Sequence, residues 1–409
     1  MKIHKPLVQA VVDTLYKIFE EDIYADKAVE QVLKQNSKFG SRDRKFIAET
    51  IYEIVRWKRL LTISLADEEG INIPFLFRLF ATHQILNELE LPDWEEFKNI
   101  DKKETLKNAA KAKKIRKYRE SIPNWLDEIG AEELGEKNWE KEIAALNKEA
   151  SVVLRVNTLK STKEALKKIL KDKCIDTFEI NTTPTLFNDG KSNSLVLQNR
   201  QRVHTLDEYK NGLFEIQDAS SQLIAPFMEL NEGQTVIDAC AGAGGKSLHI
   251  ASLMNNKGNI ISMDVEERKL IELNKRAQRA GVKIIQTKTI SPQTISQLKN
   301  TADRLLLDVP CSGLGVLRRN PDAKWKLNLE FIEQIKKTQQ EIIQNYSSML
   351  KPEGFMIYAT CSILPSENQK QVEKFLKVNN NFEFIEDRKV LPSEGFDGFY
   401  MAKLKKKTK

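Results

Sequence analysis

Strand-like and helix-like segments alternate from about residue 217 to the end of the chain, and this alternation limits the fold more than any other feature. Short apolar or β-branched runs occur at 236–238, 259–263, 284–287, 304–307 and 354–359. Helical periodicity fills the intervals at 246–253, 267–280 and 329–349. Parallel strands need such crossover helices, so we expect a doubly wound α/β sheet of the Rossmann-like class. A helix at 366–376 and strands at 382–385 and 399–402 complete it, with no long helix between the two strands.

The part of the chain before residue 217 has a different pattern. In residues 1–120, apolar positions recur at spacings of three and four, as at Val8, Val11, Val12 and Leu15, and strand-like alternation is missing. We therefore expect a small helical domain, with one helix at 42–61 that Ser41 caps. Residues 121–216 predict a small α+β module, with strands at 152–156, 177–180, 194–197 and 213–216 and a helix that Ser161 caps. Residues 217–409 then form the third domain.

Composition and charge exclude several classes of protein. The chain has 65 Lys and Arg against 58 Asp and Glu, and a balance of 41% hydrophobic and 30% charged residues excludes wholesale disorder. No stretch approaches the roughly 20 apolar residues of a membrane helix, and the first residues do not resemble a signal peptide. We expect a cytoplasmic protein without membrane contacts. The four cysteines lack zinc-ligand or disulfide spacing, so we expect reduced thiols and no metal.

A glycine-rich turn lies between the expected strand at 236–238 and the helix that follows it. Residues 238–247 read Asp-Ala-Cys-Ala-Gly-Ala-Gly-Gly-Lys-Ser. Small residues let the backbone approach a ligand, and the first N–H groups of a helix favour an anionic group. Asp264, at the end of the next strand, is placed to accept both ribose hydroxyls of an adenosine-containing cofactor. The glycines are too close together for the phosphate loop of an ATPase, so the pattern indicates a nucleotide without identifying it.

Two of the four cysteines follow strands of the expected sheet. Cys311 belongs to the loop that begins at Asp308, and Cys361 follows the strand that ends at 359. Ligands of open α/β sheets bind at the carboxyl ends of the strands, so both thiols and Asp308 are expected at one pocket. A redox pair of cysteines stays an alternative. A dinucleotide-dependent oxidoreductase would share the glycine turn and Asp264, but it gives no reason for two cysteines at the pocket edge.

These motifs together resemble the NOP/Sun (RsmB-like) family of S-adenosylmethionine-dependent RNA cytosine-C5 methyltransferases, and above all its bacterial ribosomal-RNA members. The resemblance lies in residues 238–247, 308–325, 358–363 and 397–400, and more weakly in 155–158 and 217–221. The start of the chain, with Gly-Ser-Arg-Asp-Arg at 40–44, is similar to the NusB-like RNA-binding domain of those members. The turn departs from the family at Gly242 and Ala243, where most members have Ala-Pro. The acidic residue that many members carry after the third strand has no counterpart at 289–291.

The resemblance implies a class I methyltransferase domain and a role for each matched residue. Cys361 would add to carbon 6 of cytosine, Asp308 would steer the base through its N3 and N4 edge, and Cys311 would help to remove the carbon 5 proton. The cofactor would be S-adenosyl-L-methionine, held by Cys240, Ala241, Gly242, Ala243, Gly244, Gly245, Lys246, Asp264 and Asp308. For Lys246 two interpretations stay open, a part of the polar network near the thiols or an exposed lysine of the first helical turn.

The expected partner is RNA and not DNA, with 16S ribosomal RNA favoured, and the protein is expected to be a monomer. The target base has to be unpaired or flipped out, because a stacked cytosine cannot present carbon 6 to a thiol. Phosphate contacts are expected from the basic segments 102–119 and 403–409 and around Trp325, from Arg318, Arg319, Lys324 and Lys326. A solvated lysine-rich helix, a core position for Trp325 and a disordered tail are the alternatives. A transfer RNA substrate and a non-catalytic RNA-binding assembly factor also stay open.

Overall fold

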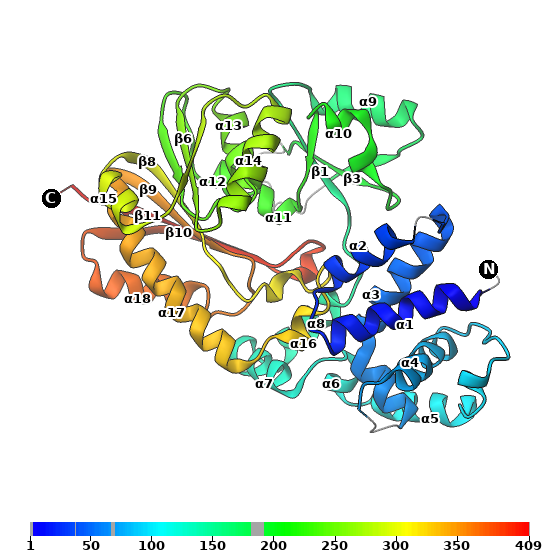
Figure 1. Cartoon of the computed structure of the whole chain (residues 1–409). Helices are drawn as coiled ribbons and strands as arrows, with labels where there is room; N and C mark the ends of the chain where they lie inside the picture. Colours follow the sequence, from blue (N-terminus) through cyan, green and yellow to red (C-terminus); the bar gives the residue numbers. More distant parts are fainter. Residues whose placement is uncertain (1–2, 37, 67–69, 181–191, 409) are drawn as a thin grey trace. The chain divides into compact units, whose positions relative to one another are not determined.

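The computed structural model describes residues 3–36, 38–66, 70–180 and 192–408 and divides the chain into two compact units (Figure 1). The first unit consists of residues 1–148 and 317–329, and the second of residues 149–316 and 330–409. The second unit thus contains both the α+β module and the parallel sheet. The division into three domains near residues 120 and 216 stays a prediction.

The described residues of the first unit form helices joined by loops and contain no strand, as the periodicity predicts. Its helices before residue 149 are α1 (Lys5–Phe19), α2 (Ala25–Gln35), α3 (Ser41–Leu65), α4 (Ile73–Leu86), α5 (Lys102–Ala112), α6 (Arg116–Arg119), α7 (Asn124–Leu134) and α8 (Glu136–Leu146). Val8, Val11 and Leu15 on α1 are fully buried against Ile47 and Ile51 on α3, so the apolar faces form one core. The predicted cap of α3 is wrong by one residue. Gly40 precedes the helix and its N–H donates to the Asp43 carboxylate over 3.0 Å, which leaves Ser41 inside the first turn.

Helix α3 bends at Trp57, whose backbone angles are not helical (φ −103°, ψ 15°). The N–H groups of Arg59 and Leu60 bond to the Ser121 hydroxyl at 2.9 and 3.3 Å instead of to the preceding turn of the helix. The carbonyl groups of Val55 and Arg56 therefore lose their normal helical partners and need other donors.

The segment 317–329 supplies these donors. It contains the short helix α16 (Ala323–Lys326) and belongs to the first unit although both of its flanks belong to the second. The Trp325 indole N–H donates to the Val55 carbonyl over 2.7 Å, and the Lys324 ammonium group donates to the Arg56 carbonyl over 2.8 Å. The Arg318 guanidinium group reaches the carbonyl of Ala145 at 2.9 Å.

The prediction that Arg318 and Lys324 contact phosphate is therefore wrong. Their relative exposures are 5% and 1%, because their side chains end on carbonyl groups inside the helical unit. Lys326 forms an ion pair with Asp22 of the same unit. Trp325 packs on the helical core, which was the alternative interpretation of this residue.

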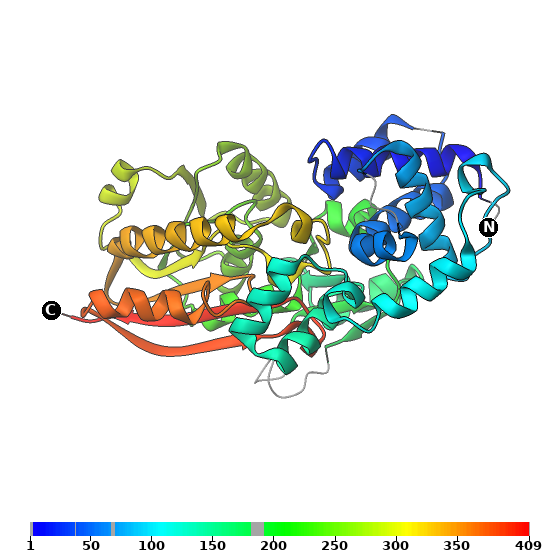
Figure 2. The same cartoon turned by 90° about the horizontal axis from the view of Figure 1, so that it is seen from below.

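The second unit contains a seven-stranded sheet with the strand order β10-β11-β9-β8-β5-β6-β7. Figure 2 shows the last strands of the chain, in orange to red, side by side. The strands are β5 (Thr235–Asp238), β6 (Asn259–Asp264), β7 (Ile285–Thr289), β8 (Ala302–Asp308), β9 (Leu350–Thr360), β10 (Phe382–Val390) and β11 (Phe399–Lys406). The pairs among β5 to β9 are parallel, whereas β11 pairs antiparallel with both β9 and β10. The predicted doubly wound sheet with two closing strands is confirmed.

Helices cover both faces of this sheet. Alternate strand residues point to opposite faces, so Ile237 and Leu305 join one core and their neighbours Val236 and Leu306 join the other. The first core includes residues of α17 (Leu329–Tyr346) and α18 (Gln369–Val378), and the second includes residues of α12 (Ile224–Phe227) and α13 (Gly245–Leu253). Helix α14 (Glu267–Ala280) packs beside α13, and α15 (Pro292–Gln297) precedes β8. All parallel strands therefore end at one edge, between two helical layers.

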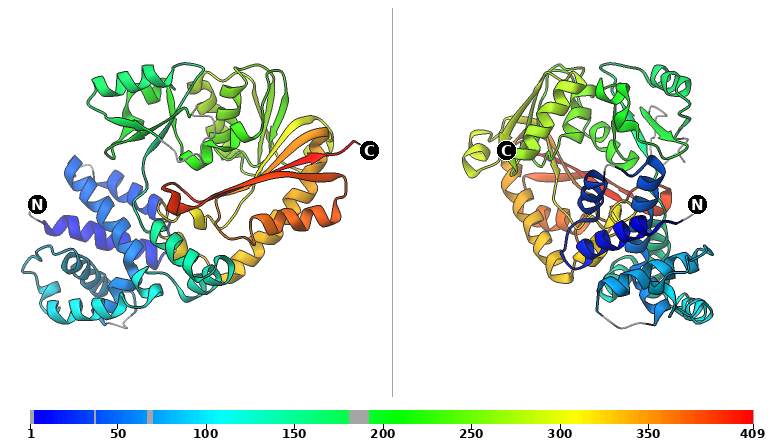
Figure 3. Two further views of the ribbon diagram at one scale, coloured as in Figure 1. Left: turned by 180° about the vertical axis from the view of Figure 1, so that it is seen from behind. Right: turned by 45° about the vertical axis from the view of Figure 1, so that its right-hand side comes forward.

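The α+β module of the second unit is a small antiparallel sheet with one main helix (Figure 3). The strands are β1 (Val153–Val156), β2 (Thr177–Glu179), β3 (Ser194–Leu197) and β4 (Phe214–Ile216), in the order β2-β3-β1-β4, and the helices are α9 (Lys163–Asp172) and α10 (Asp207–Lys210), with α11 (Ala219–Gln222) following β4. The predicted cap of α9 is one residue too early, because the Thr162 hydroxyl and not that of Ser161 accepts the Ala165 N–H, over 3.2 Å.

Two basic segments differ from the expectation of free phosphate ligands. Lys403 lies inside β11, is 2% exposed and pairs with Glu229 and Glu386, each over 2.6 Å, so a role for it on an RNA surface is wrong. In the segment 102–119, Arg116 and Arg119 each pair with two carboxylates of the helical unit. In the described residues, no helix is both long enough and apolar enough to cross a bilayer.

Candidate active site

The two predicted cysteines lie together at the carboxyl edge of the sheet. Cys311 is in the loop after β8 and Cys361 directly follows β9, the parallel neighbour of β8. Their sulfur atoms are 3.3 Å apart, and both side chains are half-buried. Two loops from adjacent strands thus bring together two thiols that are fifty residues apart in the chain.

The surroundings of Cys311 favour its neutral thiol form. The hydrogen bond to Cys361, followed by burial and the nearby charges of Cys361 and Glu367, raises the pKa of Cys311 well above its usual value. The protonated form of Cys311 is therefore favoured, while either sulfur atom can be the donor in the contact between them.

Lys246 and Asp308 form an ion pair at the same edge. Burial works against the charge of the Lys246 ammonium group, but attraction and hydrogen bonding to Asp308, with help from Asp238 and Cys361, raise its pKa. Its side chain is only 16% exposed and lies 5.4 Å from the centre of the Phe399 ring. The interpretation of Lys246 as an exposed surface lysine is therefore wrong. It is a fixed cation beside Asp308 and the thiols.

The glycine-rich turn forms an open cradle at the start of α13. Gly242 has φ +53°, and a Cβ atom built there would meet nothing within 4 Å. Gly244 has φ +84° and precedes the helix, where Leu273 packs against it. The Ala241 N–H bonds to the Met263 carbonyl over 2.8 Å, and Arg276 bonds to the Ala243 carbonyl over the same distance. The Met263 carbonyl and the Arg276 side chain therefore hold the turn, while the space beside Gly242 stays open.

Two ionisable side chains at this turn are Asp264 and Cys240. The Asp264 carboxylate is buried and accepts the N–H groups of Gly242 and Glu266, each over 2.9 Å, through different oxygen atoms. Each oxygen keeps a further acceptor position for a ligand hydroxyl. Burial and the charges of nearby carboxylates raise the pKa of Cys240 well above its usual value, so this thiol stays neutral.

Asp238 is a site residue that the sequence interpretation missed. One carboxylate oxygen accepts the Ser247 hydroxyl over 2.7 Å, while the other is buried without a hydrogen-bond partner. Burial raises the pKa of Asp238 to about 6. A buried acceptor without a donor is costly unless a ligand supplies one, so this oxygen fits a ligand with an N–H group. The signal in the sequence was an aspartate at the end of a strand, directly before the glycine turn.

Ser312, Ser362 and Glu367 were also missed. Each serine follows one of the two cysteines, and both hydroxyl groups bond to the carboxylate of Glu367. The only sequence signal was an acidic residue at 367, in the first turn of the helix expected at 366–376, and such residues are common on helix surfaces.

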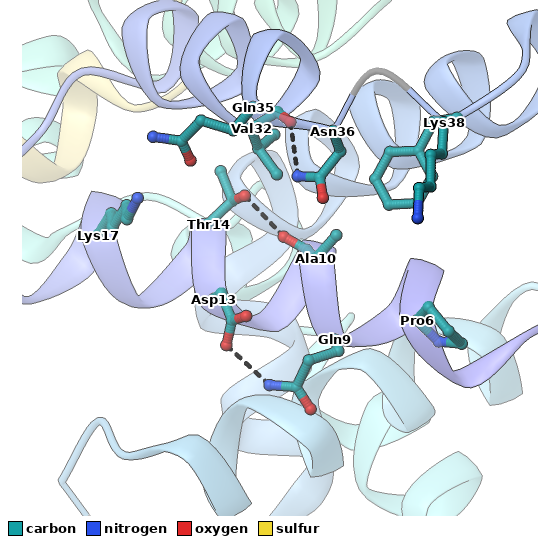
Figure 4. A pocket seen from close by; sticks show the side chains of 11 residues that line it. Pro6, Gln9, Ala10, Asp13, Thr14, Lys17, Val32, Gln35, Asn36 and Lys38 are labelled. Atoms are coloured by element: carbon teal, nitrogen blue, oxygen red, sulfur yellow. Dashed lines mark hydrogen bonds between the residues drawn. The ribbon is translucent and has the colours of Figure 1, made fainter.

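A separate groove of 710 Å³ lies in the first unit between α1 and α2 (Figure 4). Its polar lining includes Gln9, Asp13, Lys17, Asn36 and Lys38. The Gln9 amide donates to the Asp13 carboxylate, and the Asn36 amide donates to the Val32 carbonyl. None of the predicted catalytic or cofactor residues lines this groove, so it is not the thiol site.

Known proteins similar to this chain identify its family. A family model described as "16S rRNA methyltransferase RsmB/F" matches residues 225–405, and one described as "Methyltr_RsmF/B-like, ferredoxin-like domain" matches residues 122–186. "Probable ribosomal RNA small subunit methyltransferase B" of Synechocystis is 29% identical, over 96% of this chain and 97% of that protein. The chain belongs to the RsmB/F methyltransferase family. "Ribosomal RNA small subunit methyltransferase B" of Pasteurella multocida is 33% identical, over 69% of this chain and 65% of that protein.

A solved structure agrees with this membership. The "Methyltransferase Homolog Protein from Pyrococcus horikoshii" is 26% identical, with a TM-score of 0.59 over 68% of this chain and 93% of its own. The predicted family and fold are therefore confirmed. As an RsmB/F methyltransferase, the protein uses S-adenosyl-L-methionine, and the open glycine turn with the unpaired Asp238 oxygen fits this cofactor.

Proposed function

We propose that this RsmB/F methyltransferase transfers a methyl group to carbon 5 of a cytosine in RNA, and that small-subunit ribosomal RNA is the substrate. The observation that carries the proposal is the pair of thiols 3.3 Å apart beside the ion pair of Lys246 and Asp308. Methylation of an exocyclic amine needs no thiol, whereas methylation of an electron-poor ring carbon needs a nucleophile that adds to the ring first. The relatives named as small-subunit ribosomal RNA methyltransferases support the choice of RNA.

The glycine turn and the carboxylates beside it would hold the cofactor. The backbone of residues 240–245 would line it, Asp264 would accept the ribose hydroxyls, and the unpaired oxygen of Asp238 would accept an N–H group. When bound, S-adenosyl-L-methionine supplies an electrophilic methyl group on a sulfonium ion. Lys246 spans from the start of α13 to Asp308, and so links the cofactor turn to the thiol loops.

The chemistry begins with Cys361. Its thiolate forms a bond to carbon 6 of the cytosine. The electron pair of the 5,6 double bond shifts toward carbon 4 and N3, which makes carbon 5 nucleophilic enough to take the methyl group. Asp308 would accept a hydrogen bond from the cytosine amino group, and the Lys246 ammonium group would offset the negative charge that develops on the ring.

Cys311 completes the reaction. While Cys361 is a free thiol or thiolate, its hydrogen bond and charge keep Cys311 protonated. Once Cys361 is bonded to carbon, this effect disappears, and Cys311 can lose its proton to solvent. It then takes the proton from carbon 5, the double bond re-forms, and Cys361 leaves as a thiolate.

RNA binding would involve the helical unit. Exposed lysines occur on α5 and directly after it, at positions 103, 107, 111, 113 and 114. Contacts from such side chains to phosphate position an RNA without reading its sequence. The choice of a particular cytosine then depends on which unpaired base reaches the thiols.

The test combines nucleoside analysis with two cysteine variants. We expect the wild-type protein to form 5-methylcytidine in unmodified small-subunit ribosomal RNA. Cys361→Ala should abolish the product without a change in cofactor affinity, and Cys311→Ala should accumulate a covalent RNA adduct that migrates slowly on a denaturing gel. Cys174→Ala is the matched control, because that thiol is exposed in the α+β module.

Other results would decide against parts of the proposal. A product methylated on nitrogen or ribose would exclude the covalent chemistry. If the product forms only in transfer RNA, then transfer RNA and not ribosomal RNA is the substrate. Full function of Cys361→Ala in cells that lack the wild-type protein would favour a non-catalytic assembly factor.

A further inference from the structure

A third side chain joins the two loops that carry the thiols. Ser312 follows Cys311, and Ser362 follows Cys361. Both serine hydroxyls donate to the same oxygen, Oε1 of Glu367, each over 2.5 Å. The Ser312 N–H donates to Oε2 of this carboxylate over 2.8 Å. One carboxylate is thus bonded to the residue next to each thiol.

The two loops have the same local structure around these serines. The Ser312 hydroxyl oxygen accepts the N–H of Leu314 over 3.3 Å, and that of Ser362 accepts the N–H of Leu364 over 3.2 Å. Each hydroxyl group therefore closes the turn of its own loop and gives its hydrogen to Glu367. Movement of Glu367 would loosen both turns together.

Glu367 is fully buried, with an exposure of 0%. Its fourth hydrogen bond comes from the Gln339 amide over 3.0 Å, and the same amide nitrogen donates to the Pro310 carbonyl over 3.1 Å. All of these groups donate, so Glu367 acts only as an acceptor, as a carboxylate does. A buried carboxylate is costly without such donors, and an apolar side chain could fill the same space. A purely space-filling role therefore does not explain an acid at this position.

We propose that Glu367 is a positioning residue, which acts through Ser312 and Ser362 to hold the two thiol loops at the separation that catalysis requires. Its role in catalysis rests on the proposed function, but its effect on the thiols does not depend on the substrate. Glu367 bonds to neither sulfur atom. Its charge also contributes to the raised pKa of Cys311, after the hydrogen bond to Cys361 and burial.

The first experiment measures the thiols of the full-length protein without RNA. Iodoacetamide labels both cysteines at neutral pH, and mass spectrometry of the peptides gives the ratio of the Cys361 rate to the Cys311 rate. We expect a ratio of at least about tenfold in the wild type, because Cys311 keeps its proton. In Glu367→Gln the ratio should fall at least about threefold, since the loops loosen and the charge is lost. The matched control is Glu373→Gln, an exposed position on α18 that should leave the ratio unchanged.

The second experiment measures single-turnover methylation in a double-mutant cycle. Ser312→Ala and Ser362→Ala should each lower the rate about tenfold and change the affinity for RNA less than about twofold, since they touch no substrate. In a Glu367→Ala background, Ser312→Ala should lower the rate less than about twofold further, because the carboxylate that it bonds to is already gone.

The outcomes separate this inference from the proposed function. An unchanged labelling ratio in a folded Glu367→Gln protein, or additive losses in the cycle, would overturn the positioning role. If the wild type methylates no RNA, the proposed function fails, and the labelling experiment still decides the role of Glu367. If the Glu367 variants do not fold, the two serine variants decide it, and a wild-type ratio and rate in both would overturn it.

Discussion

Asp238 shows how burial acts on one side chain beside the glycine-rich turn. Burial raises its pKa from about 3.8 to about 6, with the Ser247 hydroxyl opposing the shift. Between these values the folded protein holds a proton that the unfolded chain releases, so the stability from the neutral form is complete below pH 3.8 and is lost as the pH rises through about 6.

We therefore expect Asp238→Asn to gain stability relative to the wild type as the pH rises from 4 to 6.5, by up to about 3 kcal/mol, and to gain nothing further above that range. The measurement is urea unfolding at several pH values, followed by hydrogen exchange of peptides from β5 and α13. Asp172→Asn, at an exposed position on α9, is the control and should track the wild type. A constant difference across this range would contradict the shifted pKa.

Asp264 gives a second prediction for a single side chain. Asp264→Ala should weaken cofactor binding at least about tenfold, because a ribose hydroxyl loses a charged acceptor. Loss of the contact to the Gly242 N–H should also loosen the turn. Isothermal titration with S-adenosyl-L-methionine measures the affinity, and Glu272→Ala on the exposed side of α14 is the control. An unchanged dissociation constant would remove Asp264 from the ribose site.

The cysteines could be found from the sequence, whereas Glu367 could not. Cys311 and Cys361 are rare residues that follow predicted strands, and the strand pattern alone places them at one edge. Glu367 acts through hydrogen bonds to two loops that are fifty residues apart, and only the packed structure shows which acidic residue meets both serines. Lys324 was misinterpreted for the same reason, because the carbonyl that it contacts is freed by a bend in α3.

The glycine turn before α13 allows a prediction about a secondary-structure element. A Cβ atom at Gly244 would lie 2.4 Å from Leu273 Cγ and would need φ +84°, whereas one at Gly245 would lie 3.9 Å from its nearest neighbour with no positive φ. Gly244→Ala should therefore destabilise the second unit by at least about 2 kcal/mol. Gly245→Ala, its matched control, should change the stability by less than about 0.5 kcal/mol.

Hydrogen exchange of α13 and α14 checks this ranking. Faster exchange in Gly244→Ala than in Gly245→Ala is the expected result, and equal exchange would show that the turn is not strained. Gly242→Ala should be intermediate, because its φ is positive but the space around it is open.

The sequence predicted where helices and strands lie in the chain better than it predicted the residues at which they begin. The β-branched runs and the helical periodicity located the sheet strands along the chain correctly, since burial on both faces leaves a strong apolar pattern. The caps of α3 and α9 were each displaced by one residue, because neighbouring polar residues compete for the same N–H groups. The bend at Trp57 has no sequence signal, since it depends on the hydroxyl of Ser121.

The division of the chain into two units leads to a prediction for segment 317–329. Trp325→Ala should destabilise the first unit by about 3 kcal/mol, because it removes an aromatic contact with the core and the hydrogen bond to the Val55 carbonyl. All five tryptophans of the chain lie in residues 1–148 and 317–329, so tryptophan fluorescence during urea unfolding reports on this unit.

The control for this variant is Leu329→Ala, because Leu329 is 46% exposed at the end of the same segment. Leu329→Ala should leave the urea concentration at the midpoint of the fluorescence transition the same as in the wild type. A transition of Trp325→Ala that also stays in place would show that the segment adds nothing to the stability of the helical unit.

The late position of this segment in the chain affects how the protein is made. Residues 1–148 are synthesised first, and the ribosome then has to synthesise residues 149–316 before it reaches Lys324 and Trp325. At 5–20 residues per second this delay lasts roughly ten to thirty seconds. During that time the carbonyl groups of Val55 and Arg56 have only water as a donor, and the nascent helical bundle is incomplete. Translation speed between codons 149 and 316 therefore sets how long an unfinished bundle is exposed to chaperones and proteases.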